Sequence, residues 1–266
     1  MLVQFSLNSA EARELLALGF WQSPAVKAAR RVVVCRSSTG AALMVARFAD
    51  FPWESFAAGV TLSQGVGVLR KPAPEALVEG TYWTPKALPE ITDLDAHDLV
   101  VKSGNVYDGQ RVGVLLGHRE GYGTMGRIYP GLGAKGEATG CPAPVLVPML
   151  SEKLVPPAAL LPSGYPDHAL GYASRYLVYQ PDLIFDERDA IKLLVGGEAL
   201  IVGRGASVDG VSVTTYHVSL PETSAGALFA LVDSVKGADL LPFEEQDCVG
   251  EPAGCSWGGR KSWAKL

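Results

Sequence analysis

Four short apolar runs recur along the chain, and polar or glycine residues follow each of them. They occupy residues 31–35, 98–102, 112–116 and 144–150. Consecutive valines and leucines, without alternating polar residues, are typical of strands that are buried on both faces of a sheet. A layered architecture, in which other elements cover both sides of a sheet, is therefore favoured.

Helix-forming segments alternate with these runs. The first covers residues 10–18 and ends at Gly19. The others are residues 23–30 with Ser23 as N-cap and Pro24 at the first position, residues 41–48, residues 186–195 with Asp186 as cap and Gly196 as stop, and a helix to Lys236 opened by a capping box at Ser219 and Glu222. We therefore predict an α/β three-layer sandwich with a mainly parallel Rossmann-like sheet, to which the segment after residue 160 adds hairpin–helix elements.

The length of 266 residues suits one large domain or a core with a smaller lobe. We assign residues 1–237 to a single α/β domain that includes any smaller lobe within 160–237. Residues 238–266 are rich in proline and glycine and contain Trp257 and Trp263. This arm either lies on the body or on a neighbouring subunit of a homo-oligomer, or is partly disordered.

The net charge of −5 and the pI near 5.4 argue against a general surface for nucleic acid or anionic membranes. No apolar run approaches the roughly 18 residues that span a bilayer, and the first residues do not resemble a secretory signal. We expect a cytoplasmic protein whose partner is a small anionic molecule.

The four cysteines, Cys35, Cys141, Cys248 and Cys255, are interpreted as reduced thiols. A metal or redox role for the last two is the alternative, but six residues separate them, which is not the spacing of a zinc hairpin. Neither a metal nor a cofactor is predicted.

Hydroxyl groups follow the first apolar run, in Ser37, Ser38 and Thr39, and Gly40 comes next. Between a strand and a helix, these residues offer hydroxyls and free amide donors to a phosphate or carboxylate. Ordinary N-capping of the following helix explains the same residues equally well.

Gly121, Gly123 and Gly126 form a G-x-G-x-x-G motif after the third run, with Thr124 between the last two glycines. A dinucleotide site would need a sustained helix after this motif, and Pro130 interrupts it. A loop for a mononucleotide or phosphate, which would use Gly123, Thr124 and Gly126, is the favoured interpretation; a plain turn is the other alternative.

Charged residues follow the second and fourth runs. Lys102 precedes Ser103, Gly104 and Asn105, and Glu152 lies within Ser151-Glu152-Lys153. Ligands of open α/β sheets gather outside the carboxyl ends of the strands. We therefore select Lys102 and Glu152 as catalytic candidates and Gly104 and Asn105 as ligand-binding candidates, with ordinary surface charges as the alternative.

In order, these features resemble the superfamily of ribose-5-phosphate isomerases, glucosamine-phosphate deaminases and CoA-transferases. Residues 35–40 resemble its phosphate loop, and residues 98–105 resemble its strand that ends in a lysine–glycine motif. Gly123-Thr-Met-Gly126 and Ser151-Glu-Lys-Leu-Val-Pro156 resemble an uncharacterised prokaryotic branch, where the stretches read Gly-Gly-Thr-Ile-Gly and Leu-Glu-Lys-Leu-Val-Pro. The likeness runs over residues 10–235, but only short motifs match closely.

The resemblance implies this superfamily's fold and an isomerase or CoA-transferase type of reaction. The chain departs from the isomerases at Arg111, where they have a catalytic glutamate, and at Ser103, where they have glycine. The aspartate-rich motif is reduced to residues 93–98. The glutamate motif of the CoA-transferases resembles Ser151-Glu152-Lys153 only faintly.

We therefore predict a pocket for a small phosphorylated or carboxylated metabolite, such as a sugar phosphate, a nucleotide or a CoA ester. Isomerisation and acyl or CoA transfer are the reaction classes that fit. The alternatives are a non-catalytic ligand sensor or assembly protein that retains the pocket, and a protein that binds an NAD-type dinucleotide.

Overall fold

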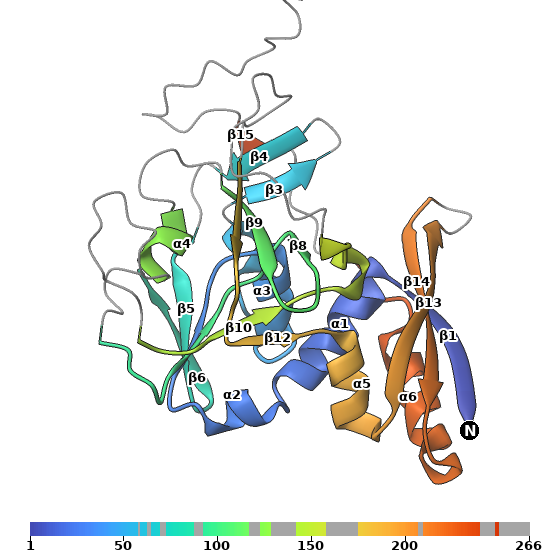
Figure 1. The fold of residues 1–266 in the computed structure, drawn as a ribbon. Helices are drawn as coiled ribbons and strands as arrows, with labels where there is room; N and C mark the ends of the chain where they lie inside the picture. The colour runs from blue at the N-terminus through green and yellow to red at the C-terminus, as the bar shows by residue number, and fades with distance from the viewer. Residues whose placement is uncertain are drawn as a thin grey trace, which may run out of the picture.

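A six-stranded mixed sheet forms the centre of the computed structural model (Figure 1). The structure describes residues 1–57, 59–62, 65–69, 73–87, 93–116, 123–128, 142–157, 175–206, 210–239 and 248–249. In spatial order the strands are β12 (Leu183–Phe185), β10 (Val145–Pro148), β7 (Leu99–Val101), β2 (Val32–Val34), β5 (Glu75–Glu79) and β6 (Tyr82–Lys86). The first four are parallel, whereas β5 pairs antiparallel with β2 and β6.

Three smaller sheets are antiparallel. They are β1–β14–β13 (Leu2–Asn8, Ser212–Ser219, Glu198–Ala206), β11–β9–β8 (Arg175–Tyr179, Val112–Leu116, Val106–Tyr107) and β15–β4–β3 (Cys248–Val249, Gly65–Leu69, Gly59–Leu62). The α/β class is therefore confirmed, but parallel pairing is largely confined to four strands. Short connections such as those between β5 and β6 or β8 and β9 allow only hairpins, since a parallel crossover needs a dozen or more residues.

Alternate residues of the parallel strands face two separate cores. Val34 and Val101 face helices α1 (Ser9–Phe20), α3 (Ser38–Val45) and α5 (Glu187–Val195), whereas Val33, Val100 and Val147 face β8, β9, β11 and the short helix α4 (Gly123–Ile128). The apolar runs at residues 31–35, 98–102 and 144–150 are therefore covered on both sides in the central sheet, whereas the run at 112–116 is β9 of an antiparallel sheet. The antiparallel sheet β11–β9–β8 and helix α4 form the layer that covers the second face of the central sheet.

The first strand of the chain belongs to a lobe that is otherwise built from its last third. β1 pairs along its whole length with β14, and the N-terminal ammonium group donates to the carbonyl of Leu220 at 2.9 Å. Helix α6 (Ala225–Val235) completes this lobe beside α1 and α5 (Figure 1). We did not predict β1, although Val3, Phe5 and Leu7 alternate with polar residues as in a half-buried strand.

Local helix signals agree with the structure at α5 and at the short α2 (Pro24–Ala28). Asp186 caps α5 in a capping box with Asp189, and Gly196 ends it with φ of +71°. The predicted capping box at Ser219 is wrong because this residue ends β14, and the chain enters α6 through a 3-10 turn, η5 (Glu222–Ser224), without a side-chain cap. A second 3-10 turn, η1 (Trp53–Ser55), precedes β3.

Part of the predicted C-terminal arm is described. Residues 248–249 form β15, which pairs with β4, and the predicted strand at residues 60–69 is the hairpin of β3 and β4. Cys35 is buried and takes part in no disulfide among the described residues, whereas Cys141 and Cys255 and the side chain of Cys248 lie outside the described residues. Within the described part of the chain, no helix is long and apolar enough to traverse a lipid bilayer.

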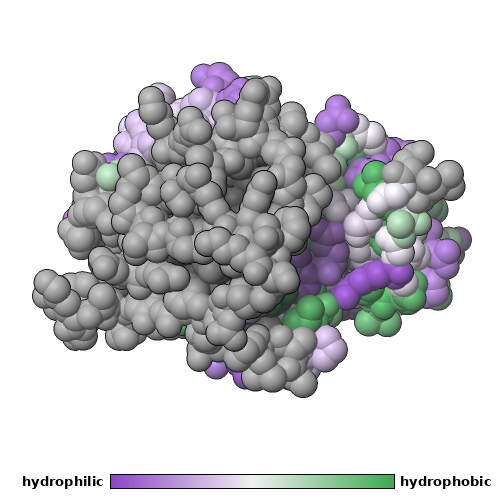
Figure 2. Space-filling view, turned by 90° about the horizontal axis from the view of Figure 1, so that it is seen from above, coloured by the Kyte–Doolittle hydropathy of each residue, from purple (hydrophilic) through white to green (hydrophobic). Residues whose placement is uncertain are grey.

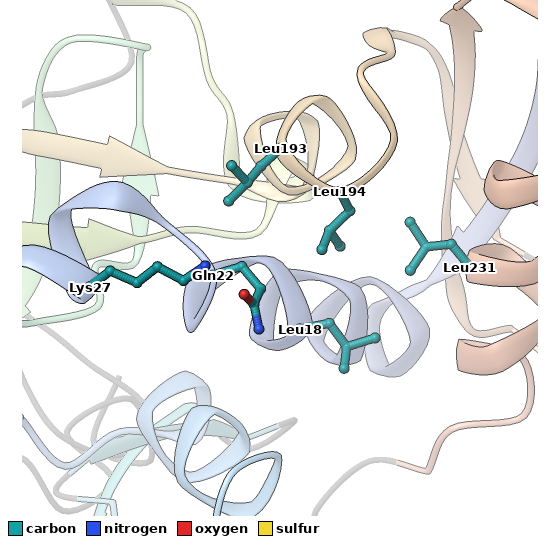
Figure 3. A pocket seen from close by; sticks show the side chains of 6 residues that line it. All are labelled: Leu18, Gln22, Lys27, Leu193, Leu194 and Leu231. Atoms are coloured by element: carbon teal, nitrogen blue, oxygen red, sulfur yellow. The ribbon is translucent and has the colours of Figure 1, made fainter. Parts of the chain in front are cut away.

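An open groove of about 470 Å³ lies between helices on the side of α1 that faces α5 and α6 (Figure 3). Its lining consists of Leu18, Gln22, Lys27, Leu193, Leu194 and Leu231. Four leucines dominate this lining, and none of the residues that we predicted as ligand-binding takes part in it.

Candidate functional site

The carboxyl ends of the parallel strands bring three predicted stretches to one edge of the central sheet. Residues 37–39 follow β2, Lys102 follows β7, and the 3-10 turn η3 (Ser151–Lys153) follows β10. The backbone N–H of Lys102 still donates to the carbonyl of Leu146 in β10, at 3.1 Å. This edge is the position at which open α/β sheets bind ligands.

Two lysine ammonium groups bond to the same loop at this edge. Lys102 Nζ donates to the carbonyl of Ser103 at 3.1 Å, and Lys153 Nζ reaches across from η3 to the carbonyl of Gly104 at 3.2 Å. Both lysines are half-buried. Among the described residues, neither ammonium group has a carboxylate oxygen within 4.0 Å. The loop after β7 therefore holds positive charge that no described carboxylate contacts directly.

Both amines lose protons more easily than ordinary lysines. Burial lowers the pKa of Lys102, although the charges of Cys35 and Glu75 act in the opposite direction. Burial also lowers the pKa of Lys153 to about 8, and the positive charges of Arg13 and Lys102 contribute to this shift. At neutral pH roughly a tenth of the Lys153 amine is therefore uncharged, far more than for a free lysine.

Glu152 lies against the first turns of α1. Its Oε2 accepts a hydrogen bond of 2.6 Å from the hydroxyl of Ser9. Burial lowers the pKa of Arg13, although the negative charge of Glu152 opposes this shift, and Arg13 Nε has no hydrogen-bond partner within the described part of the chain. Ser9 and Arg13 are four residues apart and so lie on the same face of α1. We call Arg13, Lys102, Glu152 and Lys153 the strand-end cluster.

A buried network fixes η3 below this cluster. The backbone N–H of Ser151 donates to Glu187 Oε2 at 2.7 Å, its hydroxyl lies 2.7 Å from that of Tyr216, and the Tyr216 hydroxyl donates to Glu187 Oε1 at 3.3 Å. Arg204 of β13 donates to the Ser151 carbonyl at 2.7 Å. In the view from above, hydrophilic side chains occupy a hollow beside the lobe that contains β13 and β14 (Figure 2). The lobe therefore positions the turn that holds Glu152 and Lys153.

The hydroxyl residues after β2 act in part as a helix cap. Ser37 is the N-cap of α3, and its Oγ accepts a 2.8 Å hydrogen bond from the N–H of Gly40. A Cβ on Gly40 would lie 2.6 Å from the carbonyl oxygen of Cys35, so close packing of α3 on β2 requires glycine there. Thr39 is buried and Ser38 is half-buried. Capping, the alternative interpretation, accounts for Ser37, and packing accounts for Gly40.

Gly104 and Asn105 are engaged with β9. A Cβ on Gly104 would lie 2.3 Å from Cγ1 of Val112 and 3.2 Å from the sulfur of Met149. Asn105 Oδ1 accepts a 2.8 Å hydrogen bond from the N–H of Leu115. Both residues therefore have structural roles that join the loop after β7 to the covering sheet, and the Gly104 carbonyl also accepts from Lys153.

Replacing Gly104 with alanine is expected to destabilise the protein by about 1–3 kcal/mol, because the added methyl group overlaps Val112. Urea unfolding followed by circular dichroism would measure this loss. The double variant Gly104→Ala/Val112→Ala removes the overlapping methyl groups and should lose less stability than the sum of the two single variants. Additive losses would contradict the packing explanation.

Three of the predicted ligand-binding residues, Gly123, Thr124 and Gly126, lie in α4, whose described residues do not pack against the strand-end cluster. Its Met125 and Ile128 are buried in the second core, on the far side of the sheet from α1, α3 and α5. Within the side chains that the structure describes, no hydrogen bond or ion pair links α4 to the strand-end cluster. The preceding strand β9 pairs antiparallel with β8 and β11, so β9, α4 and β10 do not form the parallel unit of a dinucleotide-binding motif.

The aspartate-rich residues 93–98 lie at the opposite edge of the sheet, before β7 begins. The carboxylate of Asp98 accepts hydrogen bonds from Arg30 and Arg31, which precede β2. Asp93 and Asp95 extend this network with one further ion pair each. These acids therefore join the amino ends of two neighbouring strands and do not reach the strand-end cluster.

Several residues of the site were not selected from the sequence. Ser9 and Arg13 share a face of α1, but the predicted range of residues 10–18 left Ser9 out; a polar pair at i, i+4 was the available signal. Lys153 was noted only as part of a motif. Glu187 sits one residue after the predicted cap of α5, and no pattern distinguishes it from a surface acid that favours a helix N-terminus.

Comparison with known proteins does not identify the chain: no family model, no curated protein and no solved structure matches it.

Proposed function

We propose that the protein binds a small phosphorylated or carboxylated metabolite at the carboxyl ends of β2, β7 and β10. The observation that supports this most directly is the pair of half-buried amines, Lys102 and Lys153, whose described hydrogen-bond partners are backbone carbonyls of one loop. A buried charge is costly unless a counter-charge accompanies it. A phosphate or carboxylate between the two amines would supply that counter-charge.

The surroundings favour an anion over a cation. Arg13 adds a third positive group whose Nε has no described hydrogen-bond partner. Glu152 is occupied by Ser9, and burial raises the pKa of the nearby Glu187 to about 8, so that this carboxyl is mostly neutral at pH 7. Most of the groups in the strand-end cluster that can still form hydrogen bonds are therefore donors, which suits an anionic ligand.

Isomerisation and acyl or CoA transfer are the reaction classes that we propose, with Lys102 paired with the anionic group and Glu152 as the candidate acid–base. The order of motifs that resembles the isomerase, deaminase and CoA-transferase superfamily supports this proposal, as does the position of both residues at strand ends. We also propose a Rossmann-like relationship for β2, β7, β10 and β12, whose parallel order follows the chain. Sugar phosphates, nucleotides and CoA esters are the ligand classes to test.

Replacing Lys102 with methionine is expected to weaken binding of the best ligand at least about tenfold, which corresponds to roughly 1.4 kcal/mol. A thermal-shift screen with inorganic phosphate, ribose 5-phosphate, AMP, NAD and acetyl-CoA would identify that ligand, and isothermal titration calorimetry would measure its affinity. Lys192→Met is the matched control, because Lys192 lies on the surface of α5 and pairs with Glu198.

Equal affinities of Lys102→Met and the unaltered protein would contradict the proposed site. Glu152→Gln separates an enzyme from a sensor: loss of turnover with affinity retained supports the acid–base assignment. Binding without turnover in the unaltered protein would instead favour the non-catalytic alternative. Stabilisation by NAD alone would favour the dinucleotide alternative.

A further inference from the structure

We propose that Lys153 is a reactive amine that forms an imine with the carbonyl carbon of the bound metabolite. The ligand class is then narrowed to small aldehydes or ketones that also carry a phosphate or carboxylate group. This inference rests on the proposed function, because the strand-end cluster must hold the anionic group of the same molecule. Sequence reasoning selected Lys102 and Glu152 for the chemistry and did not select Lys153.

Lys153 Nζ has no carboxylate oxygen within 4.0 Å among the described residues. Lys153 follows β10 within η3, and its Nζ bonds to the Gly104 carbonyl on the neighbouring loop at 3.2 Å. The positive charges of Arg13 and Lys102 act on it and lower its pKa, whereas the negative charges of Glu152 and Glu187 oppose this shift. Burial beside other cations is the arrangement that activates a lysine as a nucleophile, because the uncharged amine is favoured.

Lys102 is less suited to this role. Its Nζ bonds to the carbonyl of the very next residue at 3.1 Å and so stays on its own loop, whereas Lys153 Nζ reaches across from η3 to that loop. An ammonium group at the end of β7 is placed to pair with an anion. The two amines therefore have different expected roles, with Lys102 binding the phosphate or carboxylate and Lys153 attacking the carbonyl.

The proposed step is balanced without an oxidant or reductant. The uncharged Nζ of Lys153 donates its lone pair to the carbonyl carbon, and a proton moves from nitrogen to oxygen to give a carbinolamine. A second proton on that oxygen lets it leave as water. Amine, carbonyl compound and one proton thus give a protonated imine and one water molecule. Glu152, the residue before Lys153 in η3, is the candidate for transferring these protons.

Reductive trapping tests the proposal. The full chain is incubated at pH 7.5 with pyruvate or with glyceraldehyde 3-phosphate, sodium cyanoborohydride is added, and the modified lysine is located by peptide mass spectrometry. We expect labelling at Lys153 at least about tenfold above that at Lys192, since a lowered pKa exposes more of the free amine. Labelling at Lys153 should fall when inorganic phosphate competes for the cluster.

Lys153→Arg keeps the positive charge but cannot form the imine, so it should show only background labelling, and its affinity for inorganic phosphate by calorimetry should fall less than that of Lys102→Met. Lys192→Met should label like the unaltered protein. Binding of both probes without an adduct at Lys153, or labelling spread evenly over surface lysines, would overturn the amine proposal and leave the anion site intact. Failure of phosphate and both probes to bind would instead refute the proposed function itself.

Discussion

Replacing Asp98 with alanine is expected to lower the free energy of unfolding by about 3 kcal/mol. The Asp98 side chain is 0% exposed, and its carboxylate accepts hydrogen bonds of 2.7–3.1 Å from Arg30 and Arg31. Removing one member of a buried pair costs about 3–5 kcal/mol because a charge stays behind without a partner. The low end applies here, since the guanidinium of Arg30 is 52% exposed and regains water.

Chemical denaturation in urea would measure this loss, with Asp95→Ala as the matched control. Asp95 is a neighbour in the same network, but its side chain is 47% exposed and pairs with Arg30 alone, so its loss should be much smaller. A comparable loss in both variants would show that Asp98 has no special role in joining β2 to β7.

The free energy of unfolding should depend on pH differently in Asp98→Ala and in the unaltered protein at acid pH. Burial by itself would raise the pKa of Asp98, but hydrogen bonds from Arg31 and Arg30 lower it overall. A lowered pKa contributes stability that is fully present above the unfolded value of about 4 and is lost as the pH falls further. The advantage of the unaltered protein over Asp98→Ala should therefore be constant from pH 5 to 7 and shrink below pH 4.

The sequence predicted β2, β7 and β10 of the central sheet because these strands are marked locally, whereas β5 and β6 were not predicted. Valine runs identified β2 and β7, and the pair of Asp186 and Gly196 located both ends of α5. Pairing partners are not a local property: β1 joins β14 across more than 200 residues, and no short motif specifies that choice. The mainly parallel sheet was over-predicted for the same reason, because apolar runs reveal burial but not direction.

The candidate site was predicted at the level of strand ends and less well at the level of side chains. Lys102 and Glu152 lie where the parallel topology requires them. The glycines were misleading as markers of a ligand site. The sequence does not distinguish a glycine that leaves room for a ligand from one that leaves room for a neighbouring side chain. Gly104 belongs to the second kind because Val112 occupies the space of its missing Cβ. Arg13 could be placed only once the rotation of α1 against the sheet was known.

Replacing Glu187 with glutamine is expected to make the protein less sensitive to rising pH. Glu187 is 1% exposed, and burial, with the negative charge of Asp186, raises its pKa to about 8, although the N–H of Ser151 opposes the shift. The folded state then binds a proton that the unfolded chain releases above pH 4.5. A raised carboxyl pKa therefore costs stability progressively as the pH increases from about 4.5 to 8. Glutamine is uncharged at every pH and retains an acceptor for Ser151.

The difference in unfolding free energy between Glu187→Gln and the unaltered protein should therefore grow in favour of the variant as the pH rises from 5 to 7.5. Its upper limit is about 1.4 kcal/mol per pH unit, the value for one proton. Lys153 does not obscure this window, because its lowered pKa of about 8 affects stability mainly between pH 8 and the unfolded value near 10.5. Urea titrations at four pH values would measure the slope, with the surface variant Glu222→Gln as control. If the free energy of unfolding of Glu187→Gln and of the unaltered protein changed in the same way with pH, Glu187 would be ionised in the folded state. Its negative charge would then partly neutralise the positive charge of the strand-end cluster.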